Sequence, residues 1–242
     1  MKIKKYIKQG LNKYKVVLED NTSVVLYEDI ILKYELLLKK EITNLDIILK
    51  ENNKYELYDK CLNYLNKKLR SENEIKKYLQ KYTSNQLEID NIINKLKENN
   101  YLNNKLYIKS YINDKFYLTL EGPMKIKKDL INLGLSENDI LDELTIFNQE
   151  IIKERIEKYL TKQERINKKN LYTFKNKMLL NLLNLGYLKE DIMSYLDNIS
   201  FDDTSLKEKE YQKLKLKYSK KYSGYELEQV IKRKLYEKGY RD

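Results

Sequence analysis

Hydrophobic and polar positions follow two different periods along this chain of 242 residues. Tyr14, Val16 and Leu18 alternate with Lys15, Val17 and Glu19, a second stretch rich in β-branched residues runs from Thr22 to Leu26, and Asp20-Asn21 separates the two. Alternation with a period of two is typical of strands, and Asp and Asn favour tight turns. We therefore predict a β-hairpin. Because an isolated hairpin is only marginally stable in water, it should pack on the helices that follow or gain a third strand from residues 2–7.

From about residue 43 onward, apolar residues recur every three or four positions, which predicts helices with one buried face. The clearest stripes are Leu57, Cys61, Tyr64 and Leu65; Ile75, Tyr78, Leu79 and Tyr82; and Ile89, Ile92, Ile93 and Leu96. Helix starts are indicated by a hydroxyl residue that is followed three positions later by a carboxylate. Such pairs are Ser71 with Glu74, Ser136 with Asp139, Thr161 with Glu164, and Ser223 with Glu226. Gly122-Pro123 predicts a further helix start, with proline in the first turn.

An internal repeat organises the helical part. The motif Ile75-Lys76-Lys77-Tyr78-Leu79 recurs at residues 126–130 and 231–235, with a degenerate copy at residues 178–182. The closing leucines of the four copies are 51, 52 and 53 residues apart, and in three copies a glycine follows four positions later. Glycine at that place typically ends a helix. About fifty residues accommodate three ordinary helices with short turns, so each repeat is predicted to be a three-helix module.

The predicted fold is all-α, with tandem three-helix repeats that form an elongated curved array and a small N-terminal β-hairpin. Residues 1–53 are expected to hold the hairpin and its helices. The repeats are expected at residues 54–102, 103–149 and 150–203. A partial fourth repeat is expected at residues 204–242, because three residues follow the glycine of that copy.

Composition narrows the possible chemistry. Charged residues make up 35% of the chain, the formal net charge is +11, and the chain holds one cysteine and no histidine. Histidine-dependent catalysis, histidine-ligated metals and intrachain disulfides are thereby excluded, and no carboxylate pair comes with an apolar pocket that would tune it for acid–base work. We expect no catalytic residue, no metal and no cofactor. The absence of a long apolar run or a secretory signal favours a cytoplasmic protein without a membrane span.

Four motifs resemble the RecX family, the regulators of the RecA recombinase. Residues 70–79 match the family's Arg-Ser-x-x-Glu-Ile-x-x-x-Leu, and residues 96–104 are similar to its Leu-Lys-x-x-Gly-Tyr-Leu-Asp-Asp, with Asn103-Asn104 in place of the acidic pair. Residues 122–134 carry the glycine-led stretch of the second module, and residues 136–140 match Ser-Glu-x-x-Ile. The resemblance is good over residues 54–150, weaker to 205 and thin beyond. It implies a non-enzymatic protein that lies in the groove of the RecA filament on single-stranded DNA and limits strand exchange, ATP turnover and assisted repressor cleavage.

Basic residues lie between the apolar anchors of the repeated motif, where they would form a stripe that attracts DNA or an acidic protein surface. The candidate contacts with RecA or DNA are Arg70, Lys76, Lys77, Lys125, Lys127, Lys128, Lys232, Arg233 and Lys234. An ordinary solvated helix face in a lysine-rich chain explains the lysines equally well, and Arg70 is equally well explained by bonds at its own helix start. Tyr78, Tyr82 and Tyr111 lie on apolar stripes, so we expect them, like Cys61, in the core rather than stacked on bases.

Three functional hypotheses remain. The first is a regulator of the RecX type, a monomer whose partners are the RecA filament and single-stranded DNA, bound without sequence preference. The second is a helical-repeat DNA-binding protein that acts through its basic surface without RecA. The exposed positions are mostly lysine, which suits phosphate contact better than the reading of base edges. The third is a helical scaffold for an unrelated acidic protein.

Overall fold

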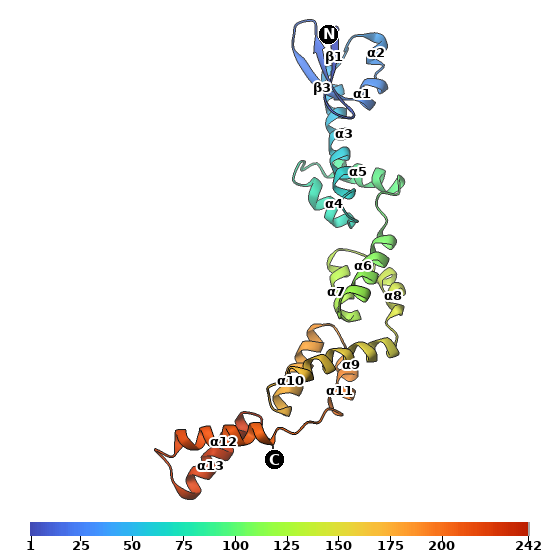
Figure 1. Ribbon diagram of the computed structural model, residues 1–242. Coiled ribbons are helices and arrows are strands. Elements are labelled where there is room, and N and C mark those ends of the chain that lie inside the picture. Colours follow the sequence, from blue (N-terminus) through green and yellow to red (C-terminus); the bar gives the residue numbers. More distant parts are fainter. Residues whose placement is uncertain (242) are drawn as a thin grey trace. The chain divides into compact units, whose positions relative to one another are not determined.

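The computed structural model describes residues 1–241, which form two compact units, Met1–Tyr107 and a second unit that begins at Ile108 (Figure 1). The first unit opens with a three-stranded antiparallel sheet in the order β1-β2-β3. Its elements are β1 (Ile3–Lys8), β2 (Lys13–Leu18), β3 (Ser23–Tyr27), α1 (Glu28–Lys33), α2 (Leu36–Lys39), α3 (Leu45–Leu65), α4 (Glu72–Leu79), α5 (Gln86–Glu98) and the start of α6 (Asn104–Leu118).

The predicted hairpin is confirmed, and it has the third strand. In the turn between β2 and β3, Asn21 adopts a left-handed conformation, with φ of 64°. The carboxylate of Asp20 accepts a hydrogen bond from the backbone N–H of Thr22 at 2.9 Å. The sheet also packs on the helices after it, since Val16, Leu26 and Ile30 belong to one buried cluster. Both ways of stabilising the hairpin are therefore used.

Helix α3 belongs to two hydrophobic clusters. Its Ile48 packs with the sheet, whereas Tyr58 and Cys61 pack with α4 and α5. Between them, the buried Asn52 accepts from the N–H of Tyr27 at 2.9 Å and donates to the carbonyl of Val25 at 3.1 Å. The predicted boundary between residues 53 and 54 therefore falls inside a continuous helix.

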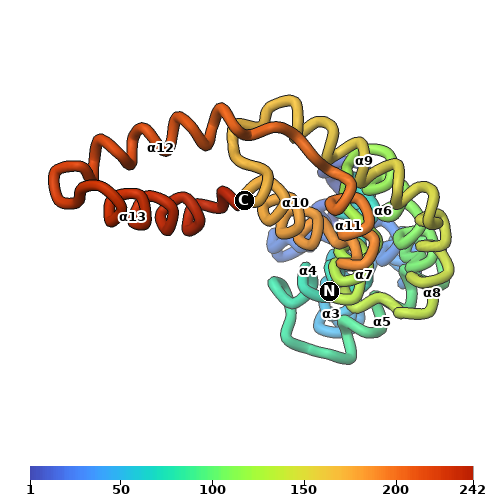
Figure 2. Tube along the Cα trace, turned by 90° about the horizontal axis from the view of Figure 1, so that it is seen from below, coloured from blue at the N-terminus to red at the C-terminus, as the bar shows by residue number. Residues whose placement is uncertain are grey.

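The second unit is helical throughout its described residues. Its elements after α6 are α7 (Pro123–Asn132), α8 (Glu137–Glu143), the 3₁₀ turn η1 (Leu144–Ile146), α9 (Gln149–Arg165), α10 (Leu171–Asn184), α11 (Lys189–Leu196), α12 (Thr204–Tyr218) and α13 (Gly224–Glu237). Helices α12 and α13 run side by side as a hairpin (Figure 2) around Leu214, Leu227 and Ile231. A mostly helical fold with a small N-terminal sheet is thus confirmed.

The second, third and fourth copies of the repeated helix, α7, α10 and α13, meet end to end. The N-terminus of α7 lies on the end of α10, where the N–H of Gly122 donates to Leu185 O at 2.6 Å and the N–H of Met124 to Gly186 O at 3.1 Å. The N-terminus of α10 lies in the same way on the end of α13, where the side chain of Asn170 donates to Lys238 O at 2.9 Å. A shared joint therefore connects α7 to α10 and α10 to α13.

The repeated positions are structurally alike. The four leucines that close the motif are all buried, and the glycines that follow have positive φ: Leu79, Leu130, Leu182 and Leu235, with Gly134, Gly186 and Gly239. Of the predicted helix starts, Ser71 forms a full capping box with Glu74, and Ser136 caps the N–H of Asp139. Pro123 is in the first turn of α7 as expected.

One predicted helix start is wrong, and another is correct but lacks the expected cap. Thr161 begins no helix, because it lies inside α9. That helix is capped instead by Asn148, whose side chain accepts from the N–H of Ile151. Ser223 is the N-cap residue of α13, so the predicted helix start is confirmed, but its side chain makes no capping hydrogen bond. A hydroxyl with a carboxylate three positions later also occurs within a helix, where the pair is on one solvated face.

Candidate functional site

The predicted contact residues of the first unit lie on and before α4. The guanidinium of Arg70 already has partners within the chain. Its Nη1 donates to Glu74 Oε1 at 3.1 Å, and the group lies 4.0 Å from the ring centre of Tyr64. By contrast, Lys77 is exposed and Lys76 half-buried, and neither forms an ion pair among the described residues. The structure therefore leaves Lys76 and Lys77, more than Arg70, open to a partner.

Glu74 is the centre of the polar cluster around Arg70. Its carboxylate also accepts from the N–H of Ser71 at 2.9 Å and the hydroxyl of Tyr107 at 3.3 Å. Burial alone would raise the pKa of Glu74, but the hydrogen bonds from Ser71 and Arg70 outweigh it, and the pKa lies below its usual value. The carboxylate is thus held charged, and it holds Arg70 in place.

The candidates on α7 differ from one another. Lys125 pairs with Glu121 at 2.6 Å, and Lys127 pairs with Glu137 at 2.7 Å. Lys128 is exposed, and within the described residues it forms no ion pair. On this helix, Lys128 is the cation whose charge is least compensated by the chain.

On α13, Glu237 compensates two of the three candidates. Lys234 Nζ lies 2.7 Å from its carboxylate, and Arg233 Nε lies 4.0 Å from it with 68% of the side chain exposed. Lys232 is exposed on the same helix. Arg233 is long, exposed and loosely paired, so it remains available to an anion.

One repeated position is open to solvent in every copy. The second residue after the buried anchor is exposed on α4, α7, α10 and α13, and it is Lys77, Lys128, Leu180 and Arg233 respectively. The third copy thus has a leucine that is 62% exposed where the other copies have a cation. A basic stripe along this position is interrupted at α10.

Sequence patterns did not identify Arg155, which is 9% exposed in α9. Its Nη1 donates to Phe116 O at 2.8 Å, and its Nη2 donates to Thr119 O at 2.7 Å and Glu121 O at 3.2 Å. Arg155 thereby fixes the segment that leads into α7. The available signal was an arginine between Ile152 and Ile156, on the apolar face of a helix.

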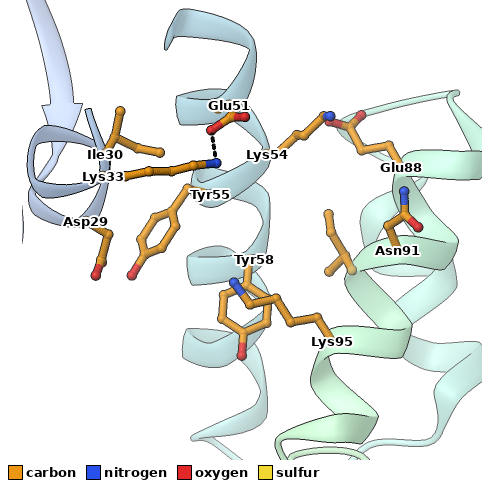
Figure 3. A pocket seen from close by; sticks show the side chains of 11 residues that line it. Asp29, Ile30, Lys33, Glu51, Lys54, Tyr55, Tyr58, Glu88, Asn91 and Lys95 are labelled. Carbon is orange, nitrogen blue, oxygen red and sulfur yellow. Dashed lines mark hydrogen bonds and ion pairs between the residues drawn. The ribbon is translucent and has the colours of Figure 1, made fainter. Parts of the chain in front are cut away.

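A groove of about 520 Å³ in the first unit is a second candidate site (Figure 3). It lies among α1, α3 and α5, with Lys95 Nζ 4.5 Å from the ring centre of Tyr58 and Lys33 bound to Glu51 at 2.5 Å. Its lining includes Lys33, Lys54 and Lys95 together with Asp29, Glu51 and Glu88. Because these charges balance, the groove attracts a polyanion less than the helix faces do.

The predictions for the aromatic residues and the cysteine are confirmed in part. Cys61 is fully buried, and burial raises the pKa of its thiol to about 12, which keeps it neutral. Tyr78 stacks on Tyr64 with ring centres 4.3 Å apart, but Tyr82 is 50% exposed, so its predicted place in the core is wrong. Tyr82 lies in the turn after α4, where Lys60 Nζ of α3 approaches its ring centre at 5.5 Å but leaves half of the side chain exposed.

The described residues contain no group of three or more His, Cys, Asp or Glu side chains placed to hold a metal ion. Over the same residues, no helix is both long enough and apolar enough to cross a membrane.

The fold and the candidate site define a mostly helical protein whose repeated helices present cations to solvent. The chain matches no protein-family model. It is 32% identical over 248 residues to regulatory protein RecX of Streptococcus agalactiae, covering 99% of this chain and 95% of that protein. It is 30% identical over 248 residues to regulatory protein RecX of Lactococcus lactis subsp. cremoris, covering 97% and 92%. The chain belongs to the RecX family.

Solved structures agree with this assignment. A crystal structure of regulatory protein RecX superposes with a TM-score of 0.68 at 23% identity, covering 82% of this chain and 99% of the other, which shows the shared fold. The crystal structure of RecX from Lactobacillus salivarius gives a TM-score of 0.55 at 27% identity and covers 62% of this chain and 99% of the other.

Proposed function

We propose that this chain is a non-enzymatic regulator that binds the RecA filament on single-stranded DNA and inhibits its strand exchange, ATPase and coprotease activities. The observation that carries the proposal is its similarity over almost the whole chain to proteins named regulatory protein RecX. In this proposal, the protein acts in the cytoplasm as a monomer and needs no cofactor.

The charge of the repeated helices supports this proposal. A filament on DNA presents phosphates and acidic side chains, and both are attracted to exposed cations. Lys77, Lys128 and Arg233 occupy the same exposed position on α4, α7 and α13. Together with Lys76 and Lys232, they are the residues that we propose contact the filament. We assign no filament contact to the candidates that form ion pairs within the chain. These are Lys125, Lys127 and Lys234, together with Arg70, which pairs with Glu74 at the start of α4.

The test measures ATP hydrolysis by RecA on single-stranded DNA while this protein is added. We expect the rate of ATP hydrolysis to decrease when one copy of this protein, or less, is added per RecA monomer. A pull-down with RecA, with and without single-stranded DNA, then distinguishes the filament from free RecA as the binding partner. Unchanged ATPase and strand exchange at saturating protein would show that the proposal is wrong.

The second candidate, a DNA-binding protein that acts without RecA, is favoured by the same exposed lysines. It predicts duplex binding with sequence preference that survives about 0.2 M salt, because base contacts depend less on released counterions than phosphate contacts do. Binding that disappears at that salt concentration counts against it.

A further inference from the structure

The tip of the α12–α13 hairpin holds a concentration of positive charge outside the repeated motif. Residues 211–225 contain five lysines and no acidic residue, so they carry five of the chain's eleven net positive charges. This segment runs from the second half of α12, through the turn, to the second residue of α13. The nearest acidic residues in sequence are Glu210 and Glu226.

Carboxylates compensate little of the positive charge at the tip, although Lys215 and Lys217 lie 5.7 Å and 5.4 Å from the ring centres of Tyr211 and Tyr218. Lys215, Lys217, Lys220 and Lys221 are exposed, and the described residues provide none of them with an ion pair. Lys213 lies 3.9 Å from Glu210 with 75% of its side chain exposed. The candidate lysines on α7 and α13 are different, since several of them already have a carboxylate partner.

Aromatic and apolar side chains accompany these cations. Tyr225 is 80% exposed and Leu216 is 74% exposed at the tip. Tyr218 and Tyr222 pack against the hairpin core, which fixes the turn that carries Lys220 and Lys221. An exposed tyrosine among lysines that lack ion pairs suits a flexible strand of nucleic acid, because the phosphates pair with the ammonium groups while a base stacks on the ring.

We propose that the tip of the α12–α13 hairpin, built from Lys215, Lys217, Lys220, Lys221 and Tyr225, binds single-stranded nucleic acid directly and without sequence preference. The site is separate from the helix positions assigned above to the filament, and it functions in the protein alone. An anionic lipid surface would also attract lysines beside a leucine. The single strand is favoured because Tyr225 is open for stacking and the tip carries one large exposed apolar aliphatic side chain, Leu216, rather than an apolar face.

The experiment measures fluorescence anisotropy of a labelled oligothymidine of about 20 nucleotides with the full chain at about 0.1 M salt. Replacement of Lys217, Lys220 and Lys221 by Ala should weaken binding at least about tenfold and lower the salt slope by about 2, since each lost phosphate contact removes about 0.7 from the slope. The control variant carries Ala at Lys153, Lys158 and Lys162, which are exposed on α9 and remove the same charge. It should stay within about threefold of the parent protein.

Tyr225→Ala tests stacking and should weaken binding of the oligonucleotide. Tyr225→Phe should bind it as the parent protein does, because phenylalanine and tyrosine rings both stack on bases. A parent protein that fails to bind the oligonucleotide, or equal losses in the two lysine variants, would overturn the proposal. Tighter capture of the tip by vesicles of anionic phospholipid than by the oligonucleotide would overturn it in favour of a membrane surface. RecA is absent from this assay, so its outcome is independent of the RecA ATPase measurement that tests the proposed function.

Discussion

Arg155 on α9 and Tyr187 in the connection between α10 and α11 meet in a hydrogen bond: Arg155 Nε donates to the Tyr187 hydroxyl at 3.3 Å. Both also bind the end of α6 or the segment that follows it. The Tyr187 hydroxyl donates to Leu120 O at 2.9 Å, and Arg155 binds the carbonyls of Phe116 and Thr119. Since this segment leads directly into α7, the pair determines where the cations of α7 are presented.

Arg155→Ala should lower the free energy of unfolding of the chain by about 3 kcal/mol, because buried carbonyls lose charged donors and cannot regain water. Urea unfolding monitored by circular dichroism measures the loss. Arg155→Lys should lose less, since it keeps the charge but not the planar set of donors. The control is Arg165→Ala at the exposed end of the same helix, with an expected change within about 0.5 kcal/mol. Equal effects of the two alanine variants would contradict this role for Arg155.

Because α7 and α10 meet closely at Gly186, we expect any side chain at this position to destabilise the fold. Gly186 has φ of +89°, and an added Cβ would lie 2.3 Å from the backbone nitrogen of Lys125. Gly186→Ala therefore combines backbone strain with a clash against backbone, and we expect a loss of about 3 kcal/mol or more. Gly10→Ala is the matched control, because Gly10 also has positive φ, +102°, but nothing lies within 4 Å of its added Cβ.

Gly10→Ala should cost about 1 kcal/mol, the strain alone. Thermal unfolding of both variants separates strain from clash. If the two variants lost the same stability, the end-to-end joint would not contribute to folding.

The sequence predicted the parts of this structure that local patterns encode. Alternation over residues 14–19, the turn residues Asp20-Asn21 and the β-branched stretch after them sufficed for β2 and β3. The spacing of the closing leucines sufficed for the buried positions Leu79, Leu130 and Leu182. The boundaries of the repeats stay a prediction. Helix α3 shows the limit of pattern arguments, because one helix supplies Ile48 to one cluster and Cys61 to another, and no local signal marks the change.

The candidate site was less predictable, because charge compensation depends on which side chains meet. Lys127 and Lys128 look identical in sequence, yet Lys127 reaches Glu137 and Lys128 remains exposed. The guanidinium of Arg70 is suited to bind an anion, but in the fold it contacts Tyr64 and Glu74. The contacts that distinguish these residues cross between elements, so a helical pattern alone does not contain them.

Because of Glu74, we expect the free energy of unfolding of the first unit to decrease in acid. Its pKa in the folded chain lies below the ordinary value of 4.5. A carboxyl with a lowered folded-state pKa stabilises the fold fully above its unfolded-state pKa, and the contribution is lost as pH falls through the folded-state value. Urea unfolding at pH values between about 6 and 3 should therefore show a loss of stability that Glu74→Gln reduces. Glutamine still completes a capping box, so the variant keeps the start of α4. An unchanged acid loss in the variant would assign the effect to other carboxyls.

Because the repeated exposed position is cationic on α7 but a leucine on α10, we expect Lys128→Glu and Leu180→Lys to change binding in opposite directions. Lys128→Glu reverses an unpaired exposed charge, so it should weaken binding to RecA filaments or DNA about tenfold with unchanged helicity. Lys127→Glu is a poorer test, because it would also place a carboxylate against Glu137. Leu180→Lys supplies the missing cation on an exposed surface, so it should strengthen binding about two- to fivefold at low salt, and the gain should disappear near 0.5 M salt. Pull-down with RecA filaments and anisotropy with labelled DNA measure both variants. If Leu180→Lys weakened binding while Lys128→Glu left it unchanged, the contact surface would be apolar at α10 and not the repeated cationic position.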